Sequence, residues 1–260
     1  MTPDEAYANS AYIPDGESYY ATWEARAAAF RKTAAQELDI PYGDGARQTF
    51  DLFYPDRGAG QSIGTVIVVH GGYWMAGSAK MFSHLAKGAV EVGYSCAILN
   101  YALAPNARIA EITRDIAAAV GAVAARTSGP LYLVGHSAGG HLVARMACPD
   151  MAAEWSARVH RVMAISPIGD LAPLRETSMN ATLGIDADEA RRESPIHHRP
   201  QDIPVTAWVG GGERPAFIDQ AQRLAQAWDC DLTIDAEKHH FDVIEGLEDP
   251  TSAMMRALFR

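Results

Sequence analysis

Short apolar segments rich in β-branched residues alternate with helical segments along most of the chain, and this alternation limits the possible folds most strongly. The segment Thr65–Gly72 (TVIVVHGG) stops at two glycines, as is typical of a strand buried on both faces. Further strands of this kind are predicted at Ser95–Tyr101, Leu131–Ser137, Arg161–Pro167, Val205–Gly211 and Asp231–Glu237, with helices at Ala107–Arg126, Ala138–Met146 and Pro215–Asp229. The pattern predicts a mostly parallel sheet with helices on both faces, in which ligands collect at the carboxyl ends of strands.

The chain is expected to form a single domain over residues 1–260. No internal repeat and no Ser/Gly-rich linker divides it. An Ala-rich helix is predicted at Thr22–Gln36, ended by Pro41 and the glycines after it, and a strand at Gln48–Tyr54. Residues 1–45 are therefore expected to be an N-terminal helical extension of that domain.

Charge and composition exclude several classes of function. The 22 Lys and Arg against 32 Asp and Glu give a net charge of −10 without a basic cluster, so we expect no nucleic acid and no membrane as partner. The first residues lack a secretory signal pattern, and no apolar run approaches about 18 residues, so we expect a cytoplasmic protein. The three cysteines are expected to be reduced thiols. The His and Cys spacings fit no metal motif and no dinucleotide fingerprint is present, so no metal and no cofactor are expected.

A candidate nucleophile follows the predicted strand that begins at Leu131. Gly135–Gly140 (GHSAGG) places a G-x-S-x-G pattern between a predicted strand and a predicted helix. Such a serine lies on a very tight turn that presents its hydroxyl, and the flanking glycines let strand and helix approach without Cβ clashes. The pattern predicts Ser137 as the nucleophile, and a phosphate-binding helix start is the alternative.

A candidate oxyanion loop, His70–Trp74 (HGGYW), follows the strand that begins at Thr65. Its two glycines allow a main-chain N–H to point at a substrate. Together with the residue after the nucleophile, the loop predicts an oxyanion hole formed by the N–H groups of Gly72, Tyr73 and Ala138. The alternative is a plain Gly-Gly turn followed by two packed aromatic residues.

A serine nucleophile needs a histidine base. Of the nine histidines, His239 and His240 are best placed, just after the last predicted strand. Adjacent side chains usually point in different directions, and sequence position alone does not separate the two. His197 and His198 follow no strand and are expected at the surface.

The histidine in turn needs a carboxylate that fixes its tautomer. Glu213 directly follows the predicted strand Val205–Gly211, and the order Ser137, Glu213, His240 matches the order serine, acid, histidine found in one class of serine hydrolases. A helix-start carboxylate without catalytic function is the alternative for Glu213. Three other carboxylates are less well placed or kept in reserve: Asp219, Asp235 and Asp170.

Together these motifs resemble the α/β-hydrolase family, and within it the esterase branch with an HGG oxyanion loop, an N-Y-x-L-A-P segment and GHSAGG. Here they are His70–Gly72, Asn100–Pro105 and Gly135–Gly140. HGGYW in place of the commoner HGGG, the run Ser166–Leu174 (SPIGDLAPL) and the ending HHFDVIEGL look most like the kynurenine formamidase (arylformamidase) group. The resemblance extends from about Tyr19 to the end of the chain.

The resemblance implies an α/β-hydrolase fold and assigns particular residues. The histidine before Phe-Asp is the catalytic one in that group, which corresponds to His240 here. Glu213 stands at the position of the acid, where Asp is usual. The chain has no long insertion for a large cap, so at most a small lid is expected from residues 171–203, assisted by the N-terminal helix.

The function implied is that of a cofactor-independent serine hydrolase that cleaves a small carboxylic ester or formamide through an acyl-enzyme. Its sharpest form is arylformamidase, which converts N-formylkynurenine to kynurenine and formate. Tyr73 and Trp74 are expected to wall an aromatic substrate pocket, whereas the sequence identifies no cationic partner for the amino-acid carboxylate. The alternatives are a general short-acyl carboxylesterase or thioesterase, and a non-catalytic binding module of hydrolase fold. Oligomeric state is not predicted.

Overall fold

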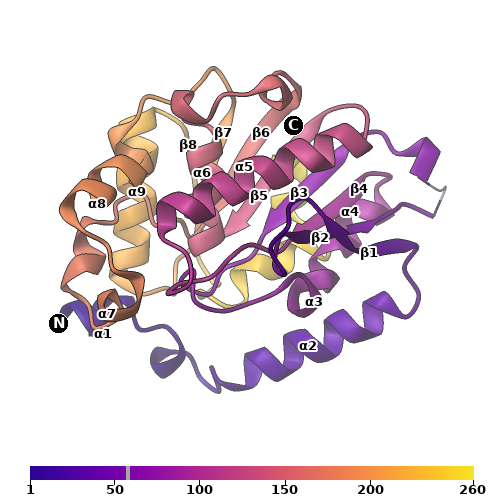
Figure 1. Ribbon diagram of the computed structural model, residues 1–260. Coiled ribbons are helices and arrows are strands. Elements are labelled where there is room, and N and C mark those ends of the chain that lie inside the picture. The colour runs from indigo at the N-terminus through magenta and orange to yellow at the C-terminus, as the bar shows by residue number, and fades with distance from the viewer. Residues whose placement is uncertain (57–58) are drawn as a thin grey trace.

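The computed structural model describes residues 1–56 and 59–260. In this part of the chain, eight strands form one sheet in the order β1-β2-β4-β3-β5-β6-β7-β8 (Figure 1). The strands are β1 (Gln36–Pro41), β2 (Thr49–Phe53), β3 (Thr65–Val69), β4 (Ser95–Leu99), β5 (Leu131–His136), β6 (Val159–Ile165), β7 (Val205–Gly210) and β8 (Asp231–Asp235). The pairs β1/β2 and β2/β4 are antiparallel and the others are parallel. The predicted mostly parallel sheet is confirmed.

Helices cover both faces of the sheet (Figure 1). They are α1 (Pro3–Tyr7), α2 (Ser18–Arg31), α3 (Ala79–Phe82), α4 (Lys87–Glu91), α5 (Ile109–Arg126), α6 (Ala138–Met146), α7 (Asn180–Leu183), α8 (Ala187–Glu193), α9 (Pro215–Trp228) and α10 (Ala253–Leu258). One apolar core contains residues of α5, α6 and α9, and a second contains residues of α2, α3, α4 and α10. The sheet therefore separates two helical layers.

The environment of strand β3 explains why four consecutive aliphatic residues follow Thr65 in it. Ile67 and Val69 belong to one core, whereas Val66 and Val68 belong to the other. Successive side chains of a strand point to opposite faces, so a strand covered on both faces needs apolar residues at every position. All five residues of β3 are buried.

The N-terminal residues differ from the expectation of a wholly helical extension. Helix α2 ends at Arg31, and residues 36–41 form the edge strand β1. In β1 only Ile40 is buried, and its pairing with β2 shifts register between Glu37 and Ile40. An exposed, irregular edge strand carries no alternation of apolar and polar residues, which explains why its sequence did not predict a strand.

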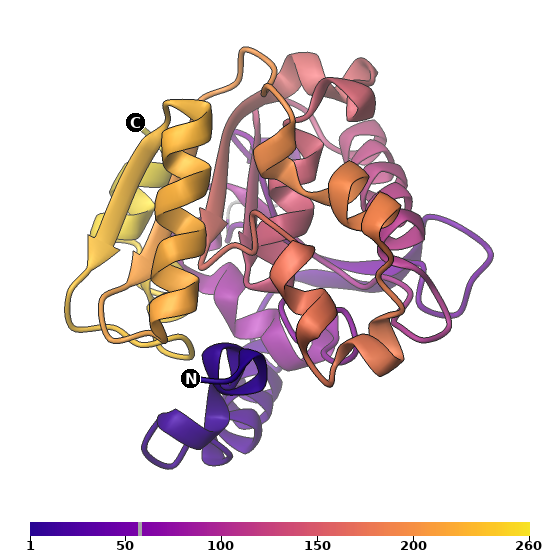
Figure 2. The ribbon, with the colours of Figure 1, turned by 90° about the vertical axis from the view of Figure 1, so that its left-hand side faces the viewer.

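The N-terminal segment crosses the end of the sheet where the parallel strands finish. Figure 2 shows this segment beneath the arrowheads of the strands, beside the helices of residues 171–203. The carboxylate of Asp4 accepts hydrogen bonds from the backbone N–H and the hydroxyl of Ser178, at 2.7 and 2.8 Å. In the described residues, no helix combines the length and the apolar character that crossing a membrane requires.

Candidate active site

Ser137 occupies a strained turn between β5 and α6. Its backbone angles are φ 57° and ψ −116°, a conformation that L-residues rarely adopt. A Cβ on Gly135 would lie 2.0 Å from the carbonyl oxygen of Gly139, and a Cβ on Gly139 would lie 2.0 Å from that of Val69. Only glycine fits at these two positions, so strand and helix approach closely enough to hold the serine on its turn.

The hydroxyl of Ser137 lies at a cavity. Ser137 is 2% exposed, and its Oγ has no hydrogen-bond partner among the described residues. Ser137, His136 and His240 all line this cavity, which has a volume of about 220 Å³. We call it the Ser137 cavity. Hydrogen bonds between a nucleophile and its base often tighten only when substrate is bound.

His240 and Glu213 form a buried pair beside this cavity. Nδ1 of His240 lies 2.6 Å from Oε2 of Glu213, and both residues are buried. A carboxylate can only accept, so Nδ1 carries the proton and donates it. In the neutral ring, Nε2 is then free to accept a proton from another group. Residues that follow three strands, Ser137 after β5, Glu213 after β7 and His240 after β8, thus come together at the carboxyl edge of the sheet.

Two residues that the sequence analysis did not single out hold this pair in place. Ser166 directly follows β6 and donates from Oγ to Oε1 of Glu213, and the backbone N–H of Gly210 donates to the same oxygen at 2.8 Å. Nε2 of His136 donates to the carbonyl oxygen of His240 at 2.8 Å. Burial holds the pKa of His136 well below its usual value, so this ring is neutral. Both residues lie at strand ends, which is the signal that would have identified them.

The structure separates the competing histidine. The ring of His239 contacts the Tyr19 hydroxyl at 3.1 Å and the Asp242 carboxylate at 3.1 Å. The ring is therefore held by contacts away from Glu213, and its Nδ1 accepts from the backbone N–H groups of Phe241 and Asp242. Of the two adjacent histidines, only His240 lies next to that carboxylate.

The competing carboxylates also have other surroundings. Asp170 forms an ion pair with Arg223 at 2.7 Å. The side chain of Asp219 is 63% exposed on α9, and Asp235 ends strand β8. None of the three forms a hydrogen bond or an ion pair with His240 among the described residues.

The loop after β3 has free backbone donors. Gly72, Tyr73 and Trp74 all have positive φ, at 112°, 52° and 58°, and the Gly72 carbonyl accepts from the N–H groups of Met75 and Ala76. Among the described residues, none accepts a hydrogen bond from the N–H of Gly72, Tyr73 or Ala138. Ala138 is the first residue of α6, where N–H groups have no partner within the helix. The three N–H groups predicted to form an oxyanion hole therefore have no acceptor among the described residues.

The two aromatic residues of this loop differ from the expectation. Tyr73 lines the Ser137 cavity, as predicted for a pocket residue. Trp74 is fully buried, packs edge-on against His141 with ring centroids 5.2 Å apart, and is absent from the cavity lining. The prediction that Trp74 contacts substrate is wrong, because the turn at Tyr73 directs the next side chain into the core.

Tyr73 also fastens the N-terminal segment to the site. Its hydroxyl donates to the carbonyl oxygen of Tyr7 and accepts from Nδ2 of Asn9 at 2.8 Å. Burial raises the pKa of Tyr73, so its hydroxyl stays protonated. The oxyanion loop and the first residues of the chain are therefore one connected unit.

The walls of the Ser137 cavity are mostly apolar. Aromatic and methionine side chains form them: Tyr20, Trp23, Met75, Met81, Phe82 and Phe241. Among the described residues that line the cavity there is no Asp, Glu, Lys or Arg. The segment 171–203, expected to form a small lid, contributes no residue to this lining, whereas α2 contributes Tyr20 and Trp23. Helix α2, rather than that segment, therefore contributes to the wall of the cavity beside Ser137.

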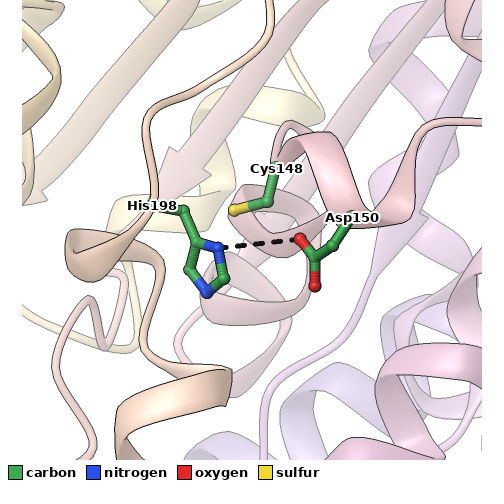
Figure 3. Close-up of side chains that lie close together, drawn as sticks. All are labelled: Cys148, Asp150 and His198. Carbon is green, nitrogen blue, oxygen red and sulfur yellow. Dashed lines mark ion pairs between the residues drawn. The ribbon is translucent and has the colours of Figure 1, made fainter.

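A cluster of metal-ligating residue types lies elsewhere in the fold. Cys148, Asp150 and His198 offer atoms within 4.8 Å of one another (Figure 3). Arg145 already pairs with Asp150 at 2.6 Å, and burial raises the pKa of the Cys148 thiol to about 12. A metal would need the thiolate and would have to displace or oppose the guanidinium. These residues therefore do not fit a metal site. His198 was expected at the surface and is half-buried in the structure.

Comparisons with known proteins agree with this architecture. A family model described as α/β-hydrolase fold matches residues 66–231. A kynurenine formamidase of Danio rerio is 27% identical over 237 residues, which cover 86% of this chain and 80% of the relative.

Solved structures extend the comparison. The crystal structure of a candidate thioesterase from Silicibacter sp. TM1040 is 48% identical, with a TM-score of 0.97 and complete coverage of both chains. Esterase B from Lactobacillus rhamnosis (HN001) is 21% identical, with a TM-score of 0.70 over 93% of this chain and 90% of that one. The likeness to esterase B shows a shared fold.

Proposed function

The chain belongs to the α/β-hydrolase family, and from this premise we propose that Ser137, His240 and Glu213 are the catalytic triad of a serine hydrolase. Membership of the family confirms the fold and the hydrolase class that the sequence motifs indicated. The observation that carries the proposal is the 2.6 Å contact between His240 and Glu213 at the cavity that Ser137 lines.

The first step forms an acyl-enzyme. Nε2 of His240 takes the proton of the Ser137 hydroxyl while Oγ attacks the carbonyl carbon of the substrate. The carbonyl oxygen becomes an oxyanion and accepts hydrogen bonds from the free N–H groups of Gly72, Tyr73 and Ala138. The imidazolium of His240, stabilised by Glu213, then protonates the leaving amine, alcohol or thiol as its bond to the acyl carbon breaks.

The second step releases the acid. His240 takes a proton from a water molecule, whose oxygen attacks the acyl carbon. It then returns that proton to Oγ of Ser137 as the bond between Oγ and the acyl carbon breaks. The net reaction adds one water and yields a carboxylic acid together with the amine, alcohol or thiol. Every proton transfer uses His240, so the reaction needs no cofactor.

The substrate we favour is an aryl formamide. The aromatic walls of the Ser137 cavity suit an aryl leaving group, and the relative in Danio rerio is named kynurenine formamidase. An aryl amine also leaves more readily than an alkyl amine. The reaction is then the conversion of N-formylkynurenine to kynurenine and formate.

A short-acyl ester or thioester is the second candidate substrate. It is favoured by the name of the 48% identical protein, a candidate thioesterase, and by the small, uncharged cavity. A non-catalytic binding module is the third candidate. It is disfavoured because the serine turn, the His240–Glu213 pair and the free N–H donors are all present together.

The proposed substrate is a small molecule and the proposed location is the cytoplasm. A cavity of about 220 Å³ has room for one small molecule beside Ser137. All three cysteines are free thiols, which suits a reducing compartment.

The experiment that tests the proposal compares two products. Formate release from N-formylkynurenine is measured beside acetate release from phenyl acetate, with the Ser137→Ala protein as blank. We expect both reactions to depend on Ser137 and deformylation to be the more efficient. Ester cleavage with little formate release would support a serine hydrolase and contradict the arylformamidase activity. If neither compound were hydrolysed in a Ser137-dependent way, the proposal as a whole would be contradicted.

A further inference from the structure

A second hollow adjoins the proposed triad. It has a volume of about 140 Å³ and is lined by His240 and Glu213 on one side and by residues of the N-terminal segment, among them Asn9 and Tyr12. Unlike the Ser137 cavity, it contains a cationic side chain, that of Arg214. We propose that this Arg214 hollow binds the amino-acid head group of the substrate, with Arg214 contacting the carboxylate and Asn9 the ammonium. The inference rests on the proposed function and names its substrate class.

The guanidinium of Arg214 is oriented without being neutralised. Its Cζ lies 3.7 Å from the centroid of the Tyr12 ring, and its Nε donates to the carbonyl oxygen of Glu5 at 3.1 Å. Among the described residues, no carboxylate lies within ion-pair distance of it. A planar cation that is stacked on an aromatic ring and has N–H groups to spare is well suited to bind a carboxylate.

Asn9 supplies an acceptor in the same hollow. Asn9 as a whole is 5% exposed, and its Nδ2 donates to the Tyr73 hydroxyl. Its Oδ1 is buried and has no donor among the described residues. A buried oxygen without a donor is costly, and an ammonium group in the hollow would provide one. Arg214 and Asn9 thus offer one cationic and one accepting group, which are the complements of an α-amino acid.

The position of the hollow fits the proposed reaction. His240 lines both the Ser137 cavity and the Arg214 hollow, so the hollow adjoins the residue that protonates the leaving group in the proposed reaction. In N-formylkynurenine the aryl ring bears a short side chain that ends in an ammonium and a carboxylate. The uncharged aromatic cavity accommodates the ring, and the hollow accommodates the charged end of the side chain. The Ser137 cavity itself offers no charged residue for that end.

The test compares a charged and an uncharged formamide. Values of kcat and KM are measured for N-formylkynurenine and for 2-formamidoacetophenone, which keeps the aryl formamide and lacks the amino acid. Arg214→Met is expected to lower kcat/KM for N-formylkynurenine about 30-fold, mainly through KM, because one charge-assisted contact is lost. The uncharged formamide should change less than about twofold. Arg191→Met, at an arginine that is 67% exposed and lines neither space, should affect neither substrate.

A binding measurement separates this inference from the proposed function. Kynurenine is titrated calorimetrically into Ser137→Ala protein and into the double variant that also carries Arg214→Met. We expect the double variant to bind about 30-fold more weakly. Equal binding by the two proteins, or an equal loss of activity on both formamides, would overturn the inference. If the wild-type protein cleaves neither formamide and yet kynurenine binding depends on Arg214, the proposed reaction is wrong and the binding site stands.

Discussion

Oγ of Ser166 donates a hydrogen bond of 2.5 Å to Oε1 of Glu213, the carboxylate oxygen that does not contact His240. The backbone N–H of Gly210 donates to the same oxygen. Both oxygens of Glu213 are therefore engaged, and the carboxylate has one orientation toward the histidine. Donors at the ends of β6 and β7 thus fix the end of the glutamate side chain, which is one methylene longer than the aspartate that the family resemblance implies at the position of the proposed acid.

Removing the Ser166 hydroxyl should slow catalysis by loosening Glu213. Ser166→Ala is expected to lower kcat about 10-fold with little change in KM, since the loss of a hydrogen bond to a charged group costs about 1.5 to 3 kcal/mol. Ser166 has φ 46°, so Ser166→Gly relieves backbone strain while losing the same bond. Ser166→Gly should lose as much kcat as Ser166→Ala, and its unfolding temperature should be higher than that of Ser166→Ala. Wild-type kcat in both variants would show that Ser166 does not position the acid.

Substitution of the acid itself should be more severe. Glu213→Gln keeps the shape of the side chain but removes the charge that holds Nδ1 of His240 protonated, so kcat on phenyl acetate should fall roughly 10³-fold. Glu213→Asp withdraws the carboxylate by one methylene and cannot keep all its contacts, so an intermediate loss is expected. Near wild-type kcat in Glu213→Gln would show that Glu213 is not the acid of the triad and would leave Asp170 and Asp235 as the candidates.

The serine turn should tolerate no Cβ at its second glycine. In Gly139→Ala the new Cβ would lie 2.0 Å from the carbonyl oxygen of Val69, so the free energy of unfolding should fall by more than about 3 kcal/mol. Gly60→Ala is the matched control, because nothing lies within 4 Å of a Cβ at that position. Urea denaturation followed by circular dichroism measures both. Equal midpoints for the two variants would show that the turn is not tightly packed.

Stability should fall in mild acid because of a buried histidine. Burial, together with the charges of Arg26 and Arg31, lowers the pKa of His84 to about 3. Between pH 7 and pH 5 the unfolded chain binds a proton at this ring and the folded protein does not, so folding loses about 2 kcal/mol at this site as the pH falls. His84→Leu should remove about that much of the pH dependence in urea denaturation.

The exposed His197 provides the control for this experiment. Because its ring is exposed in the folded protein, His197→Leu controls for the loss of an imidazole without the loss of a buried one. If the two leucine variants showed the same slope between pH 7 and pH 5, the buried ring of His84 would not contribute to the acid sensitivity.

Local sequence predicted the elements whose residues are constrained by burial or by a turn. Helix α6 was predicted at its observed bounds, because the glycines of the serine turn fix its start. Strand β3 was predicted because both of its faces are buried. The rule that ligands collect at strand ends indicated Ser137, Glu213 and the pair His239 and His240, and only the family resemblance selected His240. The structure places Ser137, Glu213 and His240 at one edge of the sheet.

What the sequence could not predict depends on contacts between distant segments. Asn9 forms a hydrogen bond with Tyr73, which lies 64 positions further along the chain, and no local sequence pattern in either segment predicts that contact. The same holds for Arg214. It lines a hollow beside His240 because residues of the N-terminal segment complete that lining. Trp74 was misplaced because the direction of a side chain after two residues of positive φ is set by the tertiary turn.

The central claim is that the hydroxyl of Ser137 is the nucleophile, and covalent labelling tests it most directly. The protein is treated with diisopropyl fluorophosphate, residual phenyl acetate hydrolysis is followed, and the adduct is located by mass spectrometry of peptides. We predict one adduct per chain on Ser137, formed in parallel with the loss of activity and absent from the Ser137→Ala protein. Inactivation with the adduct on another residue, or full activity in a chain labelled at Ser137, would contradict the claim.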